Sequence, residues 1–562
     1  MKKYLLVLVG LCCVLSYALA ERPDYPELKK SDANIIGHVL DKKTKEHLPY
    51  ITIALKGTTI GTVTDATGHY FLKNLPEGNF ILEVSSVGYK TVTRNVTLKK
   101  GKTLEEDFEI EEDAIALDGV VVSANRSETT RRMAPTLVNV VDLKLFETTN
   151  SSTLSQGLNF QPGVRVETNC QNCGFQQVRI NGLDGPYTQI LIDSRPVFSA
   201  LSGVYGLEQI PASMIERVEV MRGGGSALFG SSAIAGTINI ITKEPLRNSG
   251  QLSHTITSLG GSSSFDNNTS LNASLVTDDH RAGLYIFGQN RYRSGYDYDG
   301  DGFTELPKLK NQTVGFRSYL KTSTYSKLTF EYHHMQEFRR GGDMLNRPPH
   351  EAHIAEQLQH SIDGGSLKFD YFSPDEKNRL SVFASAANTD RDSYYGPGND
   401  PLKAYGKTTD LTAMGGAQYV HTFDKCFFMP SDLTAGLEYN RDRLKDNMWG
   451  YNRHTDQTVN IYSAFLQNEW KNDRWGILIG GRLDKHNMVD NVIFSPRANL
   501  RFNPTQNINL RLSYSSGFRA PQAFDEDMHI ENVGGTVAMI ERAKDLKEEK
   551  SQSFSVSADM YH

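Results

Sequence analysis

The chain contains little cysteine, which excludes a scaffold held together by disulfides. Five cysteines occur in 562 residues, and Cys12 and Cys13 lie in the apolar segment at the N-terminus. Cys170, Cys173 and Cys426 remain, too few to staple a fold of this length. No run of 18 or more apolar residues follows the first segment, so we expect no membrane-spanning helix.

Long tracts of one charge and common catalytic motifs are also absent. The formal net charge is −6, and no basic stretch indicates a nucleic-acid partner. The sequence has neither HExxH nor GxSxG. The stretch "GSALFGSS", residues 225–232, almost fits the phosphate-binding pattern GxxxxGK[ST], but Ser231 stands where lysine is required. We therefore predict a protein that is not an enzyme and requires no cofactor.

The first twenty residues predict export from the cytoplasm. Lys2 and Lys3 precede an apolar run, and Ala-Leu-Ala at 18–20 supplies small residues for cleavage. This layout is typical of a secretory signal peptide, which we assign to residues 1–20.

Residues 21–113 are expected to form a small β-sandwich, because short strand-like runs are separated by Gly, Pro and Asp turns. Ile51, Ile53 and Leu55 alternate with smaller or polar residues, as in half-buried strands. The stretch "GHVLDKKTKEHLPYITIALKGTTIGTVTDATGHYFLKNLPEGNFILEVSSVGYKT" resembles the carboxypeptidase regulatory-like domain that precedes outer-membrane transporters in Bacteroidetes-type bacteria.

Residues 125–245 mix strands with short helices. The stretches "QVRINGLDGPYTQILIDSRPV" and "IERVEVMRGGGSALFGSSAIAGTINIITK" resemble the plug domain of TonB-dependent outer-membrane receptors. Gly223–Gly225 and Gly230 are then expected to supply positive φ and close backbone approach, not a phosphate loop.

Residues 114–124, "AIALDGVVVSA", form an apolar stretch with few turn residues between these two domains. By composition alone the stretch is an unpaired strand or a linker. Ahead of a plug it resembles the TonB box region, where an extended segment pairs with an energising partner by strand addition. The resemblance implies the TonB-ExbB-ExbD complex as partner, with candidate contacts at Leu117, Val120, Val121 and Val122.

From residue 246 onward the chain consists of about fourteen alternating segments separated by polar turns. Leu328, Phe330 and Tyr332, for example, alternate with polar residues, as in strands between lipid and a wet lumen. A soluble sandwich could show the same alternation, but the signal peptide and the plug resemblance favour a barrel. The family's barrel has 22 strands, so we interpret residues 246–562 as its N-terminal part, in a C-terminally incomplete chain.

The predicted fold class is therefore mainly β. It comprises an N-terminal β-sandwich, an α+β plug domain and a partial transmembrane antiparallel β-barrel. The expected location is the outer membrane, with the lipid bilayer as a partner.

An acidic stretch, "SGYDYDGDGFTE", is a candidate calcium site. Asp297, Asp299 and Asp301 offer oxygen ligands two residues apart, but Lys308 replaces the bidentate glutamate of an EF-hand. In position the stretch resembles the calcium-binding loop of cobalamin transporters of this family. An exposed turn held by its own Asp side chains is the alternative.

The sequence Phe-Arg-Ala-Pro at 518–521 matches the FRAP motif of these receptors. In haem receptors a histidine ligand follows it, so Arg519 and His529 are candidate substrate-binding residues. Two features of haem receptors are missing: an NPNL-like motif, and a plug histidine, since none occurs between His69 and His254. A solvated or capping role for His529 is the alternative.

His350 and His353 in "RPPHEAH" are a third candidate, because one helical turn would align them for a metal or a macrocycle. Exposed polar histidines are the alternative.

Cys170 and Cys173 in "NCQNCGF" are a fourth candidate. A single CxxC pair is an incomplete zinc site. In an oxidising exterior we predict a disulfide between them that tightens a plug turn, with Cys426 unpaired. Thiolate ligation of a metal substrate is the alternative.

Together these features predict a TonB-dependent receptor for active uptake of a scarce metal chelate. The Asp-rich stretch and "VVVSANR" favour cobalamin, FRAP with His529 favours haem, and a ferric siderophore is a third candidate. A surface lipoprotein is a further expected partner. Two alternatives stay open: an adhesin-like surface β-protein without transport, and a SusC-like carbohydrate importer, whose barrels are longer.

Overall fold

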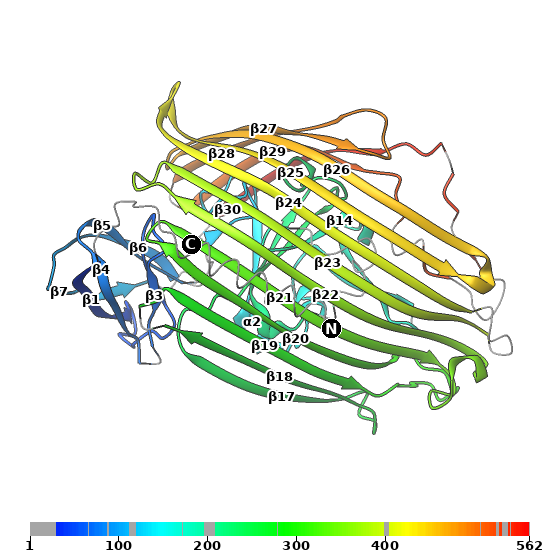
Figure 1. Ribbon diagram of the computed structural model, residues 1–562. Helices are drawn as coiled ribbons and strands as arrows, with labels where there is room; N and C mark the ends of the chain where they lie inside the picture. The colour runs from blue at the N-terminus through cyan, green and yellow to red at the C-terminus, as the bar shows by residue number, and fades with distance from the viewer. Residues whose placement is uncertain are drawn as a thin grey trace, which may run out of the picture.

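The computed structural model describes residues 30–65, 67–86, 89–111, 120–170, 172–195, 208, 210–277, 279–397, 404–505, 507–523, 528–530, 538–539, 541–543 and 545–560. The predicted signal peptide and Leu117 lie outside these residues. No helix of the described part is long and apolar enough to cross a membrane. Strands dominate, in a small N-terminal domain, a plug and one large curved sheet (Figure 1).

The N-terminal domain is a β-sandwich, as its sequence predicts. Its two four-stranded sheets consist of β1 (Lys30–Asp41), β4 (His69–Pro76), β7 (Thr103–Glu105) and β8 (Phe108–Ile110), and of β3 (Gly61–Val63), β2 (Thr52–Leu55), β5 (Gly78–Ser86) and β6 (Tyr89–Leu98). Ile51, Ile53 and Leu55 are buried in the core between the sheets. The alternation read from the sequence therefore marks the inward face of this domain.

Among the described residues, the large sheet contains fourteen strands, each antiparallel to the next in chain order. They are β17 (Ser249–Ser258), β18 (Phe265–Val276), β19 (Ala282–Arg293), β20 (Lys308–Ser323), β21 (Ser326–Gly342), β22 (Ile354–Phe372), β23 (Asn378–Pro397), β24 (Tyr405–Cys426), β25 (Met429–Met448), β26 (Arg453–Lys471), β27 (Trp475–His486), β28 (Ile493–Thr505), β29 (Ile508–Arg519) and β30 (Glu549–Met560). The predicted count of fourteen segments is confirmed.

The two faces of this sheet have opposite polarity. On β21 the polar residues Thr329, Glu331 and His333 are buried, whereas Phe330 and Tyr332 are only half-buried. Polar groups therefore face the enclosed side, and apolar and aromatic groups face outward. This arrangement suits a wall with lipid on its convex side, and it confirms the predicted fold class.

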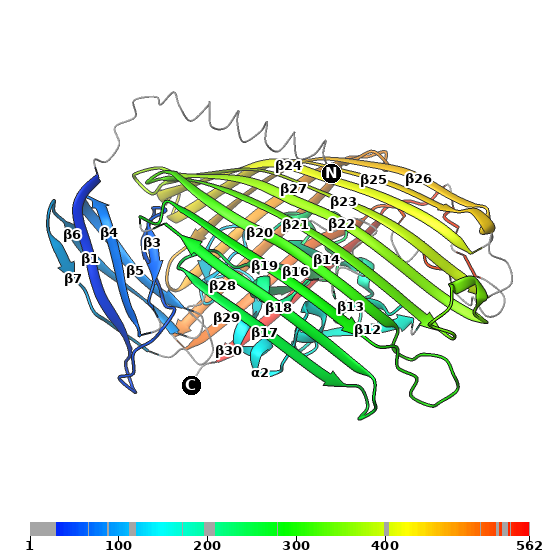
Figure 2. The ribbon, with the colours of Figure 1, turned by 60° about the horizontal axis from the view of Figure 1, so that its bottom comes forward.

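The plug lies within the curve of the large sheet (Figure 2). Its main sheet has the order β11 (Val138–Asp142), β15 (Ile215–Arg222), β16 (Gly236–Thr242) and β14 (Thr188–Ile192). The hairpin of β12 (Val164–Cys170) and β13 (Phe175–Ile180) and the short pair of β9 (Val120–Val121) and β10 (Thr129–Thr130) accompany it. Its helices in the described residues are α2 (Leu143–Thr148), α3 (Leu154–Leu158), α5 (Ser226–Phe229) and the 3₁₀ turns η1 (Gly185–Tyr187) and η2 (Ala212–Met214).

The glycine-rich stretch serves the backbone geometry that the sequence interpretation requires. Gly223 and Gly230 have φ of 86° and 82°, a region that favours glycine. Gly225 has a φ of −103°, so the expected positive φ does not hold there. A Cβ on Gly224 would lie 2.9 Å from Oγ of Ser515 in the barrel wall. The stretch therefore fits α5 closely against the inner face of the large sheet.

The β-sandwich touches one end of the large sheet (Figures 1 and 2). The backbone N–H of Thr59 donates to the carbonyl oxygen of Thr324, in the turn between β20 and β21, at 3.0 Å. The guanidinium of Arg247, just before β17, lies 3.6 Å from the ring centroid of Tyr50. The sandwich therefore lies at the end of the sheet that carries the turn between β20 and β21.

Buried ion pairs fasten the plug to the wall. Glu438 on β25 lies between Arg126 of the plug and Arg482 of β27, at 2.5 and 2.7 Å, and all three side chains are at most 5 % exposed. Glu208 of the plug faces Arg339 on β21 at 2.8 Å. Each charge is out of water and depends on its partner.

We expect Glu438→Ala to loosen the plug, because it leaves Arg126 and Arg482 without their shared carboxylate. Removal of one partner from a buried pair costs about 3–5 kcal/mol. The temperature at which the purified protein loses its heat-modifiable gel migration should therefore fall. Asp424→Ala, which removes an exposed partner of Lys377, is the control and should change it little. Equal shifts for both variants would show that the Glu438 pairs do not hold the plug.

Candidate functional site

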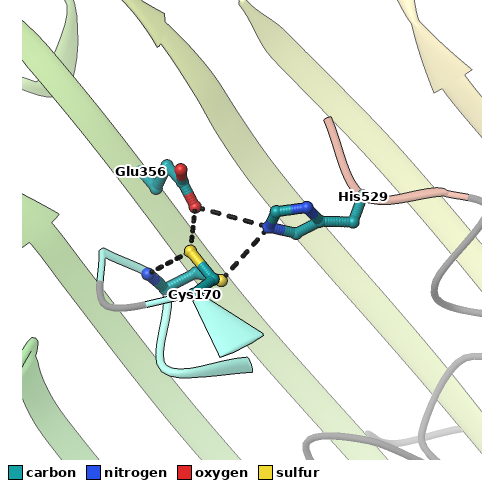
Figure 3. Close-up of side chains that lie close together, drawn as sticks. Cys170, Glu356 and His529 are labelled. Atoms are coloured by element: carbon teal, nitrogen blue, oxygen red, sulfur yellow. Dashed lines mark hydrogen bonds and ion pairs between the residues drawn. The ribbon is translucent and has the colours of Figure 1, made fainter. Parts of the chain in front are cut away.

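Four metal-ligand side chains meet where the tip of the β12–β13 hairpin touches the barrel wall. Cys170 and Cys173 come from the plug, Glu356 from β22, and His529 from the segment after β29. One ligand atom of each lies within 4.8 Å of the others. Figure 3 shows Cys170, Glu356 and His529 pointing toward one another. We call these four residues the thiol cluster.

The hairpin turn brings the two cysteines together. Gly174 has a φ of 66°, which favours glycine, and its N–H donates to the carbonyl oxygen of Cys170 at 2.9 Å. The N–H of Cys173 donates to Sγ of Cys170 at 3.3 Å. The CxxC spacing therefore forms one tight turn with both sulfurs on the side of the wall.

The contacts within the thiol cluster run between chain segments far apart in sequence. Sγ of Cys170 donates to Oε2 of Glu356 at 3.1 Å, and Sγ of Cys173 lies 3.3 Å from Nε2 of His529. Nε2 of His529 lies 3.5 Å from the same oxygen of Glu356. Cys173 and Glu356 are buried, so the cluster is largely closed to bulk water.

Aromatic rings enclose the imidazole of His529. The ring centroids of Phe175 and Tyr395 each lie 5.3 Å from that of His529. Phe175, Tyr395 and Cys173 belong to one hydrophobic cluster, which also contains Leu358, Met448 and Ile530. The side chain of His529 is only 12 % exposed. It is therefore neither a solvated nor a capping histidine.

The surroundings shift the pKa values of two members of the cluster. The hydrogen bond with Cys173 lowers the pKa of Cys170, burial raises it, and His529 lowers it again, with a net value of about 7. Burial alone would lower the pKa of His529, but the contacts with Cys170 and Glu356 raise it to about 10. The contacts within the cluster therefore shift the two pKa values in opposite directions, that of the thiol down and that of the imidazole up.

The predicted disulfide between Cys170 and Cys173 is wrong. Neither residue is disulfide-bonded in the structure, and nor is Cys426. The sulfur of Cys170 is directed at Glu356 and that of Cys173 at His529. These two partners lie on the barrel side, so the CxxC pattern alone could not reveal them.

Arg519 is not a member of the thiol cluster and contacts other residues. Its guanidinium pairs with Glu549 on β30 at 3.6 Å and lies 5.2 Å from the ring centroid of Tyr187 in η1. FRAP therefore places Arg519 at a contact between plug and wall. A role of Arg519 in substrate binding stays a prediction.

His350 and His353 do not converge. The 3₁₀ turn η3 (Pro349–Glu351) ends before His353, so the predicted helical alignment is wrong. Nδ1 of His350 lies 2.9 Å from the hydroxyl of Tyr405, and Nδ1 of His353 lies 2.6 Å from a carboxylate oxygen of Asp343. The two imidazoles thus have separate partners.

The acidic stretch keeps only part of its predicted ligand set. Asp297 and Asp299 lie close together, and Glu305, which the sequence interpretation missed, joins them within 4.8 Å. Asp301 is not a member of that group and instead accepts from the N–H of Phe303. The carboxylate of Asp297 accepts from the N–H groups of Gly300 and Gly302. These contacts match the expected Asp-held turn, and calcium binding stays a prediction.

The valines of the predicted TonB box are already engaged. Val120 and Val121 pair with Thr129–Thr130, and Val121 is buried. The N–H groups of Val122 and Ser123 each donate to Oε2 of Glu219 at 2.9 Å. Strand addition by a partner at these residues therefore requires the release of this pairing.

Glu356 is the ligand-type residue of the cluster that the sequence interpretation missed. It opens β22 in the run "IAEQLQH", where Leu358 and His360 share its inward face. A carboxylate at an inward position is the only local signal. Glu356 is far from Cys170 along the chain, so no spacing motif could link the two residues.

Comparison with known proteins defines the class of the chain. Residues 235–562 match the model of the TonB dependent receptor-like beta-barrel, residues 130–237 that of the TonB-dependent receptor plug domain, and residues 35–122 that of the CarboxypepD_reg-like domain. The chain therefore belongs to the family of TonB-dependent receptors. It is an outer-membrane β-barrel protein, as predicted.

Among curated proteins, the chain resembles the vitamin B12 transporter BtuB of Vibrio vulnificus strain CMCP6, with 24% identity over 425 residues. The match covers 73% of this chain and 64% of that protein, so the chain spans less than two thirds of its length. In strain YJ016 the BtuB protein is 33% identical over 174 residues, which cover 30% of this chain and 28% of that one.

Among solved structures, the siderophore receptor PirA from Acinetobacter baumannii superposes with a TM-score of 0.64 at 18% identity. The match covers 77% of this chain and 69% of PirA. At such identity the likeness shows the fold. By their names the relatives are transporters and receptors, which accords with the predicted absence of enzyme activity.

We expect Glu219→Ala to free the segment that contains Val122 and Ser123. Their N–H groups would lose a buried acceptor, at a cost of about 1–3 kcal/mol for each unpaired group. Hydrogen exchange of a peptide covering both residues should therefore become faster. Glu147→Ala, at an exposed position of α2, should leave the exchange unchanged. Slow exchange in both variants would show that Glu219 does not hold the segment.

Proposed function

We propose that this receptor imports a metal-containing solute across the outer membrane. The solute classes to consider are cobalamin, haem and ferric siderophores. The observation that carries the proposal is the thiol cluster, which gathers metal-ligand side chains at the boundary between plug and wall. Relatives named as vitamin B12 transporter and siderophore receptor support a metal-containing solute.

The position of the thiol cluster supports entry from outside. Glu356 lies at the beginning of β22, a strand of 19 residues that is about 60 Å long at 3.3 Å per residue. The β-sandwich contacts the other end of the wall, beside the turn before β21. A solute captured at the cluster would thus lie at the opposite end from the sandwich.

Energy is proposed to arrive at the sandwich end through residues 114–124, from the TonB-ExbB-ExbD complex. Release of Val122 and Ser123 from Glu219 would free a strand for pairing with the partner. The outer membrane holds no nucleotide supply, so a mechanical pull on the plug replaces local hydrolysis.

Haem fits the cluster less well than the FRAP motif suggests. Nε2 of His529 already faces Cys173 and Glu356, between two aromatic rings. An axial bond to haem iron would require the imidazole to leave these contacts. Cobalamin and ferric siderophores require no such rearrangement if they bind above the cluster.

The test is uptake in cells that lack the gene. Cells with the receptor should grow on one limiting solute among cobalamin, haem and a ferric siderophore, and should accumulate that solute in labelled form. Val120→Pro should abolish accumulation but retain surface binding, because proline cannot donate to a strand ladder. The unaltered receptor in cells without TonB is the matched control and should also bind without accumulation.

Two results would overturn the proposal. If growth on all three solutes is independent of the receptor, metal-chelate import is wrong. If surface binding occurs and neither Val120→Pro nor the loss of TonB changes any phenotype, the adhesin-like alternative is correct.

A further inference from the structure

We propose that Cys170, Cys173, Glu356 and His529 together form a binding site for one labile divalent transition-metal ion of the zinc class. Metal binding by the folded receptor can be tested without transport, and only its role in uptake rests on the proposed function. If the site serves uptake, the solute is a metal ion that exchanges its ligands and not a chelate that keeps them.

The chemistry of the donor set selects the ion. Two thiols with one imidazole form a borderline-soft set that suits Zn²⁺ and its neighbours among the divalent transition metals. Ca²⁺ and Mg²⁺ prefer oxygen ligands only, so the two sulfurs disfavour them. The carboxylate of Glu356 in turn favours a divalent ion over Cu⁺, which prefers thiolate and thioether ligands.

The spacing of the donor atoms fits a tetrahedral site. Metal–ligand bonds of about 2.0–2.3 Å give a tetrahedron with edges of about 3.3–3.8 Å. The separations between donor atoms are 3.1 Å for Cys170 and Glu356, 3.3 Å for Cys173 and His529, and 3.5 Å for His529 and Glu356. The other three separations are within 4.8 Å, so shifts of at most about an ångström would seat an ion.

The polar partners of Glu356 also suit a cation. Its buried carboxylate contacts the thiol of Cys170 and the imidazole of His529. A thiol is a weak hydrogen-bond donor, so the imidazole of His529 is the main group that offsets the burial of this carboxylate. A divalent ion between the four donors would take over that role and would replace the protons now held by the thiols and the imidazole.

Burial limits what can enter. Cys173 has no exposed surface, and Phe175 and Tyr395 pack against His529. A macrocycle does not fit between side chains whose ligand atoms lie within 4.8 Å of one another. The ion must arrive bare, or in a complex that surrenders it to the two sulfurs.

The test uses the full-length receptor in detergent, reduced and kept free of oxygen. Zn²⁺ should bind with one high-affinity equivalent in competition with a chromophoric chelator. Co²⁺ should give the intense near-ultraviolet absorption of cobalt–thiolate charge transfer, and Zn²⁺ should abolish it. Both readouts are independent of transport.

Single variants assign the ligands. Cys170→Ser, Cys173→Ser and His529→Ala should each weaken Zn²⁺ binding about 100-fold or more, since even changes beyond the ligands cost 10–100-fold. Glu356→Gln should weaken it by at least about 10-fold. Cys426→Ser is the matched control, because Cys426 is also a free thiol but ends β24, remote from the plug hairpin, and should bind as the unaltered protein does. Heat-modifiable migration identifies the variants that remain folded. If the cysteine variants do not fold, Glu356→Gln still tests the metal site.

The outcomes separate this inference from the proposed function. Absence of saturable Zn²⁺ binding, or binding that persists in folded Cys170→Ser and Glu356→Gln, overturns the metal site even if the receptor imports cobalamin or a siderophore. Zn²⁺ binding with these variant effects upholds the site. Receptor-dependent uptake of cobalamin, haem or a ferric siderophore decides the proposed function separately.

Discussion

The structure depends on the satisfaction of charges on the concave face of the large sheet. Arginines and carboxylates there lie out of water, and such groups are costly unless they are paired. Glu438 of the wall forms ion pairs with Arg126 of the plug and Arg482 of the wall. Glu208 of the plug forms an ion pair with Arg339 of the wall. The plug is therefore a required electrostatic partner of the wall. This requirement fixes its position, and with it the position of the hairpin that carries the two cysteines.

Alternation with a period of two was sufficient to predict about fourteen strands, because each strand separates an apolar from a polar environment. The choice of a barrel over a sandwich rested on the signal peptide and the plug resemblance. Ile53 in the sandwich and Glu331 on β21 both lie on the buried face that this pattern indicates. The plug was predictable for another reason, namely long stretches of family-like sequence. Gly223 and Gly230 then proved to have the positive φ expected of them.

The candidate site was predictable only in part. Cys170, Cys173 and His529 were each recognised, but as members of separate motifs with separate roles. No spacing rule joins them to Glu356, because the contact arises from the docking of the plug hairpin in the barrel. The same long-range contacts bear on the wrong disulfide, since Cys170 has Glu356 and Cys173 has His529 as a partner from the barrel side. Val122 gave a similar lesson, because its partner Glu219 is remote in sequence.

Two donors of the thiol cluster come from the plug and two from the barrel. The sulfurs belong to the plug, whereas the carboxylate and the imidazole belong to the wall and the segment after β29. Any sliding of the plug past the barrel by about the length of a coordinate bond, roughly 2 Å, would split the coordination sphere into two incomplete halves. A pull on the plug would thus separate the ligands of a bound ion. It would weaken the binding of that ion without any chemical reaction.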